Sequence, residues 1–394
     1  MTAVVFLTHL AIILLVGILC TIFSEKLKIS NILLLIIAGM FIGTIRYRGE
    51  LLVQFPQVFL TSIGILALVL IVFDSSSRFK LREFTSLSIN ALELTGYFLL
   101  LNVVFLSILV YKMFPTTSVF MALLFATLMS GTAPDAIVMM IGNTKNKVLE
   151  LMEVESLVNT PVIVVFPFIM LDFLKSVEVE FIFSKFLEQI GPFLQQIVTG
   201  IGAGILIGIV VYKFMKRPYS ETLSPLAMIT FALFAYILAE NLGGNGVLAV
   251  TTTGLFFGNV YLSHKLQLKV VAAFFANSLE ILVFVLVGIT IKIPLNYNFI
   301  FKSIILFVLY LILRYIAINI SLRDLKLRLK EKLFMTFNVQ KGIAVAVVAF
   351  TLKTLNIGGI DVILHLTLLF MLYSIILSTF VIRFSDYFIK KSSK

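Results

Sequence analysis

Apolar runs long enough to cross a bilayer follow one another along almost the whole chain of 394 residues, separated by short polar stretches. A membrane-spanning helix needs about 20 mostly apolar residues, because each residue rises 1.5 Å and the hydrocarbon layer is about 30 Å thick. About thirteen runs meet this requirement, which predicts an all-α polytopic membrane protein. The predicted transmembrane helices lie near residues 2–23, 29–45, 56–75, 85–112, 116–142, 148–173, 186–212, 222–240, 243–262, 268–291, 298–321, 331–354 and 361–382.

Polar residues, Gly and Pro interrupt two of these runs at corresponding places in the two halves of the chain. The fifth run is broken around residues 131–134, and the twelfth around residues 338–342. Such a pair points to inverted repeats whose discontinuous helices meet at a substrate site. If the seventh span is a linker, the broken helix is the fifth helix of each repeat. The pattern therefore predicts an inverted-repeat transporter fold.

The distribution of Lys and Arg predicts the orientation of the chain in the membrane. Basic residues accumulate in cytoplasmic loops, and here they cluster at 78–82, 213–217 and 323–332 and in the carboxyl-terminal tail. We therefore expect a multi-pass protein of the cell (plasma) membrane with its N-terminus outside and its C-terminus in the cytoplasm. Residues 1–8 carry no basic residue and no small-residue cleavage site stands out at the end of the first run, so we interpret it as a retained helix.

Composition argues against several other classes of protein. The chain is 60% apolar and 13% charged, and its net charge of +11 fits basic loops that face anionic lipid. One Cys and three scattered His give no spacing for a transition-metal site, and no phosphate-binding loop of the Walker type is present. We therefore expect no cofactor, no nucleotide and no nucleic-acid partner. Because no His accompanies the candidate hydroxyls, an enzyme is also not expected.

Ionisable side chains lie inside the predicted membrane spans, notably in S-G-T-A-P-D at 130–135 and E-S-L-V-N-T-P at 155–161. A charge in hydrocarbon is costly and normally faces a cavity, a partner or an ion path. When residues are counted from the nearest cytoplasmic Lys or Arg, one charged residue in each of four spans lies at the same depth in the membrane. Asp74 of the third span lies closer to the cytoplasmic surface. These four are Asp135, Glu155, Arg314 and Lys341.

The sixth predicted helix carries an oxygen-rich face. Glu155 and Asn159 are i, i+4 neighbours, and so are Ser156 and Thr160. Prolines in the fifth and sixth helices also free backbone carbonyl oxygens. Oxygen ligands of this kind suit Na+ or K+, and the ends of a broken helix carry partial charges that Asp135 and Lys341 are placed to offset.

These residues resemble the monovalent cation/proton antiporters of the NhaP type. Five segments fall in the order of that family: L-V-L-I-V-F-D at 68–74, E-S-L-V-N-T-P at 155–161, the stretch 238–259 ending G-L-F-F-G-N, L-R-Y at 313–315 and K-G at 341–342. The resemblance implies a homodimer of thirteen-helix subunits in membrane lipid. Each subunit would have a mobile six-helix core with crossed broken helices.

The resemblance also implies a division of the chain and roles for single residues. Residues 1–82 and 176–297 would form the scaffold and dimerisation helices, the second range including the linker helix. Residues 83–175 and 298–394 would form the transport core, which moves like an elevator. Glu155 and Arg314 would form a structural ion bridge, whereas Thr132, Ser156 and Asp74 would line the site.

Two acidic residues that this family usually carries are absent. The chain has Thr160 after the Asn of helix six, and Ala133 between the Thr and Pro of helix five, where the family has Asp. In the family, cation and proton compete for the helix-six carboxylate, and a Thr cannot titrate in this way. We therefore predict that Asp135, or else Asp74, supplies the titrating charge. The predicted cation and proton site comprises Asp74, Thr132, Asp135, Ser156, Asn159 and Thr160.

The predicted function is exchange of a monovalent cation for protons by alternating access, with Na+ expected first and Li+ or K+ as alternatives. The other hypothesis is an uncoupled cation carrier or sensor that has lost proton coupling. Each site residue also has a purely structural interpretation. Glu155 and Arg314 would then only lock the core, Asp135 and Lys341 would compensate helix dipoles, and Asn159 and Thr160 would bond helices together.

Overall fold

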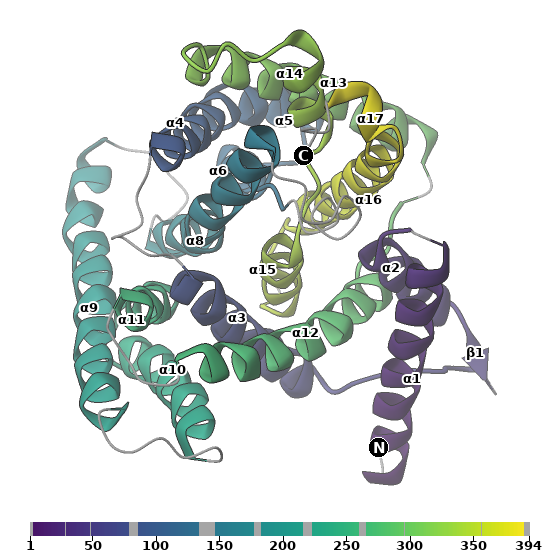
Figure 1. The fold of residues 1–394 in the computed structure, drawn as a ribbon. Coiled ribbons are helices and arrows are strands. Elements are labelled where there is room, and N and C mark those ends of the chain that lie inside the picture. Colours follow the sequence, from purple (N-terminus) through teal and green to yellow (C-terminus); the bar gives the residue numbers. More distant parts are fainter. Residues whose placement is uncertain are drawn as a thin grey trace. The chain divides into compact units, whose positions relative to one another are not determined.

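The computed structural model is built almost entirely from helices (Figure 1). It describes residues 3–27, 29–47, 49–78, 86–133, 146–176, 183–215, 223–259, 265–294, 296–355 and 357–389. The helices are α1 (Ala3–Leu27), α2 (Asn31–Ile42), α3 (Gln57–Arg78), α4 (Ser86–Leu101), η2 (Asn102–Leu106), α5 (Ser107–Met113), α6 (Val119–Leu128), α8 (Lys147–Ser176), α9 (Phe183–Met215), α10 (Leu223–Asn241), α11 (Gly246–Asn259), α12 (Lys265–Thr290), α13 (Tyr297–Ser321), α14 (Leu329–Phe337), α15 (Ile343–Thr354), α16 (Asp361–Arg383) and α17 (Ser385–Phe388).

Every predicted span overlaps a helix, which confirms the all-α polytopic class. Within the described residues, six helical segments are long and apolar enough to cross a membrane, and several shorter apolar helices accompany them. The six segments are Val4–Leu27, Gln57–Arg78, Leu87–Met113, Leu194–Phe214, Tyr297–Ser321 and Asp361–Arg383. A short antiparallel pair, β1 (Arg46–Tyr47) and β2 (Glu50–Leu51), follows α2 and turns at Gly49, whose φ of 88° suits glycine.

Helix ends follow local chemistry. The Ser118 side chain accepts a hydrogen bond from the Met121 N–H and so caps α6, and Asn296 caps α13 through the Asn298 N–H. Such caps satisfy backbone donors that have no partner within the helix. The twelfth predicted span is interrupted where the sequence indicated, because α14 ends at Phe337 and α15 begins at Ile343.

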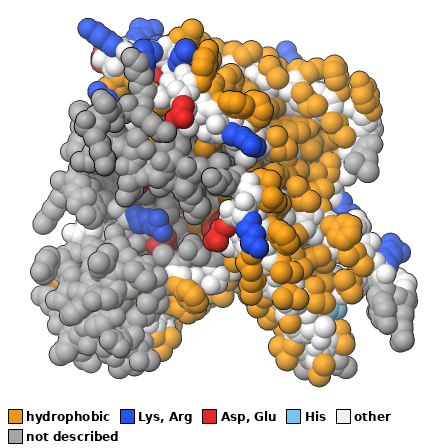
Figure 2. Space-filling model, turned by 45° about the vertical axis from the view of Figure 1, so that its right-hand side comes forward, with side chains coloured by type: hydrophobic (Ala, Val, Ile, Leu, Met, Phe, Trp, Pro, Cys, Tyr) orange, Lys and Arg blue, Asp and Glu red, His pale blue; other side chains and the backbone are white. Residues whose placement is uncertain are grey.

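The exposed surface is strongly apolar. Only 11% of an 18-residue apolar window within Val4–Leu27 is buried, and hydrophobic side chains cover most of the described surface in Figure 2. Soluble monomers rarely expose continuous apolar patches larger than a few hundred Å². This surface therefore suits contact with lipid, as expected for a multi-pass membrane protein.

The chain forms two compact units. The larger unit comprises Met1–Gly64, Thr85–Asn159 and Glu280–Lys394, and the smaller unit comprises Ile65–Phe84 and Thr160–Leu279. The division into scaffold and transport core at residues 1–82, 83–175, 176–297 and 298–394 is a functional assignment and stays a prediction.

Close helix packing in the smaller unit depends on glycines of α9. A Cβ on Gly204 would lie 2.5 Å from the Ala249 carbonyl oxygen of α11, and one on Gly200 would lie 2.6 Å from the Asn245 carbonyl oxygen. The backbones of α9 and α11 can approach this closely only because these positions carry no side chain. Gly202 of the same helix faces open space instead.

We predict that Gly204→Ala lowers the midpoint of thermal unfolding, because its methyl group would force α9 and α11 apart at a cost of about 1–3 kcal/mol. Gly202→Ala is the matched control, and it should leave the midpoint unchanged or raise it, since Ala favours a helix by about 1 kcal/mol over Gly. Circular dichroism of the detergent-purified variants during heating provides the measurement. Equal midpoints for the two variants would contradict this account of the packing.

Candidate functional site

The two interrupted helices cross within the larger unit. After α6 ends at Leu128, the chain runs without helix through Ala133, and the Ala133 N–H donates a 2.8 Å hydrogen bond to the carbonyl of Gln340. Gln340 lies in the stretch between α14 and α15. A backbone hydrogen bond therefore joins the non-helical segments of the two interrupted spans, where the sequence predicts that discontinuous helices cross.

Lys341 makes the second connection between the two segments. Its fully buried ammonium group donates to the carbonyl oxygens of Met129 and Gly131, both at 2.6 Å, and to the Tyr310 hydroxyl at 2.5 Å. The three acceptors match the three donors of an ammonium group. Because the carbonyl end of a helix carries a partial negative charge, a cation at the end of α6 is favourable. The contacts place Lys341 at the carbonyl end of α6, and its role as a dipole compensator stays a prediction.

Glu155 of α8 and Arg314 of α13 form a buried ion pair. Arg314 Nη1 lies 2.6 Å from Glu155 Oε1 and Nη2 lies 2.7 Å from Oε2, and both side chains are at most 1% exposed. The Arg314 guanidinium also lies over the Phe98 ring, 4.8 Å from its centroid. A bidentate pair of this kind fixes the geometry of both groups. Both carboxylate oxygens of Glu155 are thereby occupied by a permanent cation.

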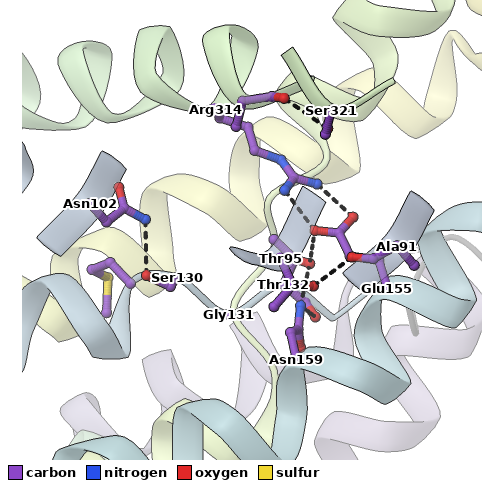
Figure 3. Close-up of polar contacts among 12 residues, drawn as sticks. Ala91, Thr95, Asn102, Ser130, Gly131, Thr132, Glu155, Asn159, Arg314 and Ser321 are labelled. Carbon is purple, nitrogen blue, oxygen red and sulfur yellow. Dashed lines mark hydrogen bonds and ion pairs between the residues drawn. The ribbon is translucent and has the colours of Figure 1, made fainter. Parts of the chain in front are cut away.

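Thr132 and Asn159 extend this ion pair into a network (Figure 3). The Thr132 hydroxyl donates to Glu155 Oε1 at 3.3 Å. It accepts in turn from Asn159 Nδ2 at 2.9 Å, and the same amide also reaches the Thr132 carbonyl oxygen at 3.3 Å. The structure therefore brings together four of the predicted residues: Thr132, Glu155, Asn159 and Arg314.

Four buried amide oxygens lie on residues of this network or of the crossing. Asn102 Oδ1, Asn159 Oδ1, Asn338 Oδ1 and Gln340 Oε1 have no hydrogen-bond partner among the residues that the structure describes. A buried acceptor without a partner costs about 1–3 kcal/mol, so a group of them calls for an explanation. Neutral amide and hydroxyl oxygens are ligands that bind alkali cations in proteins.

The remaining predicted site residues are placed as follows. Ser156 and Thr160 lie on α8, and both are half-buried. Asp74 lies on α3 in the smaller unit, where its Oδ2 accepts from Arg78 at 2.6 Å. Its buried Oδ1 has no hydrogen-bond partner within the described ranges. Asp135 lies outside the described residues.

Two residues at the crossing were not anticipated from the sequence. Tyr310 binds Lys341 as described above, and Asn102 donates from Nδ2 to the Ser130 hydroxyl at 3.1 Å (Figure 3). Tyr310 lies four residues before Arg314, so their shared helix face was a usable signal. Asn102 is a single amide inside the apolar stretch 98–106. A polar side chain at such a position is as unusual as a buried charge and likewise indicates a specific partner.

The sequence is similar to those of known cation/proton exchangers. The family described as "Sodium/hydrogen exchanger, transmembrane" matches residues 10–385. The probable Na(+)/H(+) antiporter 2 of Methanocaldococcus jannaschii is 27% identical over 308 residues, which cover 75% of this chain and 71% of that protein. The K(+)/H(+) antiporter NhaP2 of Shewanella sp. (strain ANA-3) is 25% identical over 60% of this chain, which spans only 41% of that relative.

A solved structure has the same fold. The structure of the sodium proton antiporter MjNhaP1 from Methanocaldococcus jannaschii at pH 8 superposes with a TM-score of 0.75 and 18% sequence identity, and covers 97% of both chains. This likeness extends over nearly the whole chain and concerns the arrangement of the helices.

We predict that Arg314→Leu destabilises the protein by about 3–5 kcal/mol, because it leaves the Glu155 carboxylate buried and unpaired. Lys353→Gln is the matched control, since it breaks a 2.7 Å pair with Asp361 that is largely exposed and worth about 1 kcal/mol or less. Heating the purified variants and following helix content by circular dichroism gives the comparison. The double variant Glu155→Leu with Arg314→Leu should recover much of the loss, whereas equal losses for Arg314→Leu and Lys353→Gln would contradict the prediction.

Proposed function

The chain belongs to the sodium/hydrogen exchanger family, and we propose that it is a secondary active transporter that exchanges a monovalent cation for protons by alternating access. One structural observation carries the proposal: buried neutral oxygens of Thr132 and Asn159 gather beside a locked ion pair where two interrupted helices cross. In secondary transporters, discontinuous helices of this kind form the substrate site.

The proposed cation ligands come from the fifth and sixth helices. Thr132, Ser156, Asn159 and Thr160 offer hydroxyl and amide oxygens, and Asn159 Oδ1 is buried with no partner in the described part of the chain. The Glu155–Arg314 pair acts on this set indirectly, because Glu155 accepts the Thr132 hydroxyl and so orients it. Na+ is the proposed cation, with Li+ and K+ as alternatives, and relatives of the chain are named as Na+/H+ and K+/H+ antiporters.

Coupling to protons needs a carboxylate that can be free in one state and protonated in the other. Glu155 does not meet this need, since both of its oxygens bind Arg314. We therefore assign the coupling role to Asp135, two residues beyond Ala133, and second to Asp74. Cation and proton would compete for this carboxylate, so one would leave as the other binds.

The proposal includes the surroundings in which the exchange takes place. The transporter would lie in the cell membrane as a homodimer, with its N-terminus outside and its basic carboxyl-terminal tail in the cytoplasm. The six-helix core would carry the bound cation across the membrane. Lys341 would hold the crossing together during this movement through its contacts with Met129 and Gly131.

The test of exchange uses purified protein in liposomes that contain a pH-sensitive dye. Adding Na+, Li+ or K+ outside should raise the internal pH, because protons leave the liposome as the cation enters. Cation uptake without any pH change would favour the uncoupled carrier instead.

We predict that Asp135→Asn reduces this cation-driven pH change at least about tenfold, because an amide cannot bind the competing proton. The control is Asp361→Asn, which neutralises a largely exposed carboxylate and should keep most of the activity. If Asp135→Asn keeps wild-type exchange, the coupling role passes to Asp74, and Asp74→Asn in the same assay decides that assignment.

Asn159→Leu should raise the cation KM about tenfold while the protein stays folded, because it removes a buried ligand oxygen and a donor to Thr132. The control is Asn241→Leu, which removes an exposed amide that bonds to the Ile237 carbonyl within its own helix. Initial rates of the dye signal at a series of cation concentrations give both KM values. An unchanged KM in Asn159→Leu would remove Asn159 from the site.

A further inference from the structure

A π-helical turn interrupts the long helix formed by α4 and α5. Across η2, the Ser107 N–H bonds to the Asn102 carbonyl five residues back, and the Ser107 hydroxyl bonds to the Val103 carbonyl that an α-helix would have used. The backbone enters and leaves the turn at ordinary helical angles. Turns of this kind are rare and occur frequently at functional sites, because the inserted residue changes the direction in which its side chain points.

The polar residue that opens this turn is Asn102. It is fully buried, its Nδ2 donates to the Ser130 hydroxyl at 3.1 Å, and that hydroxyl donates to the Ala126 carbonyl at 2.9 Å. Ser130 is the residue after the last turn of α6 and stands two positions before Thr132. Asn102 therefore holds the chain where helix five unwinds (Figure 3).

Successive residues of the unwound segment are held from different elements. Lys341 binds the carbonyls of Met129 and Gly131, on either side of Ser130. Asn159 of α8 binds Thr132, and the Gln340 carbonyl accepts from Ala133. Asn102 supplies the contact that ties Ser130 to another helix, whereas the other two hydrogen bonds of Ser130, to the Ala126 and Thr127 carbonyls, stay within α6.

We propose that Asn102 is a positioning residue for the cation site and that the π-helical turn serves to aim its amide at Ser130. The proposal rests on the proposed function, because it assigns Asn102 to the placement of Thr132 in the cation site. In this proposal Asn102 acts through its hydrogen bond to Ser130 on the geometry of the next two residues. Its removal should therefore weaken cation affinity more than it slows the transport cycle.

The experiment is a double-mutant cycle with Asn102→Leu, which keeps the number and branching of the side-chain heavy atoms, and Ser130→Ala. In proteoliposomes, each single variant should raise the cation KM about three- to tenfold with a maximal rate within about twofold of wild type. The double variant should show no more than the effect of Ser130→Ala, because both substitutions break the Asn102–Ser130 hydrogen bond and Ser130→Ala also removes the bond to the Ala126 carbonyl. Leu94→Ala, a buried apolar truncation in α4, should lower thermal stability without raising KM.

Other results overturn the proposal. An unchanged KM in Asn102→Leu, or single effects that multiply in the double variant, would show that Asn102 does not act through Ser130. If wild-type protein exchanges no protons for any cation, the proposed function fails, and the Asn102 proposal is then decided by cation-induced thermal stabilisation of the detergent-purified protein. Loss of that stabilisation in Asn102→Leu but not in Leu94→Ala supports it; equal stabilisation in wild type and Asn102→Leu, or none in wild type, refutes it.

Discussion

Backbone groups that are freed where a helix stops inside a bilayer have no water to bond, so the protein itself must satisfy them. Here the Lys341 ammonium donates hydrogen bonds to two carbonyl oxygens beyond the end of α6, and the Gln340 carbonyl accepts one from the Ala133 N–H. The contacts of each broken helix thus come partly from the other. Each interruption therefore helps to satisfy the backbone groups that the other leaves free.

The lack of water also makes a buried charge costly unless it has a partner. A buried carboxylate without a partner costs several kcal/mol, and the Arg314 fork offsets this cost for Glu155 through two short hydrogen bonds. The ion pair then has no free charge with which to attract a cation, but it orients the Thr132 hydroxyl. What the network presents is a set of neutral oxygens held in fixed positions. The charge that couples cation to proton must come from another acidic residue, and this is why Asp135 and Asp74 matter.

Much of the fold could be predicted from the sequence, because apolar runs must become helices in a bilayer and because Gly342 and its polar neighbours stand out within such a run. Depth counting also placed Glu155 and Arg314 at one level, and the structure pairs them. The contacts of Asn102 and Tyr310 could not be predicted, since they depend on a π-helical turn and on how two helices cross. Asp135 lies outside the described residues, so its role stays a prediction. The placement of Asp74 beside the same site also stays a prediction, because Asp74 belongs to the other unit.

The central claim is that a cation and a proton compete for one site at this crossing. The most direct measurement is proton release when a cation is added to detergent-purified protein in weakly buffered solution, followed with a pH indicator and compared with cation binding measured by calorimetry. The account predicts that protons are released in proportion to the cation bound and that the apparent cation affinity falls as the pH is lowered. Cation binding with no proton release, and with the same affinity at every pH, would contradict it.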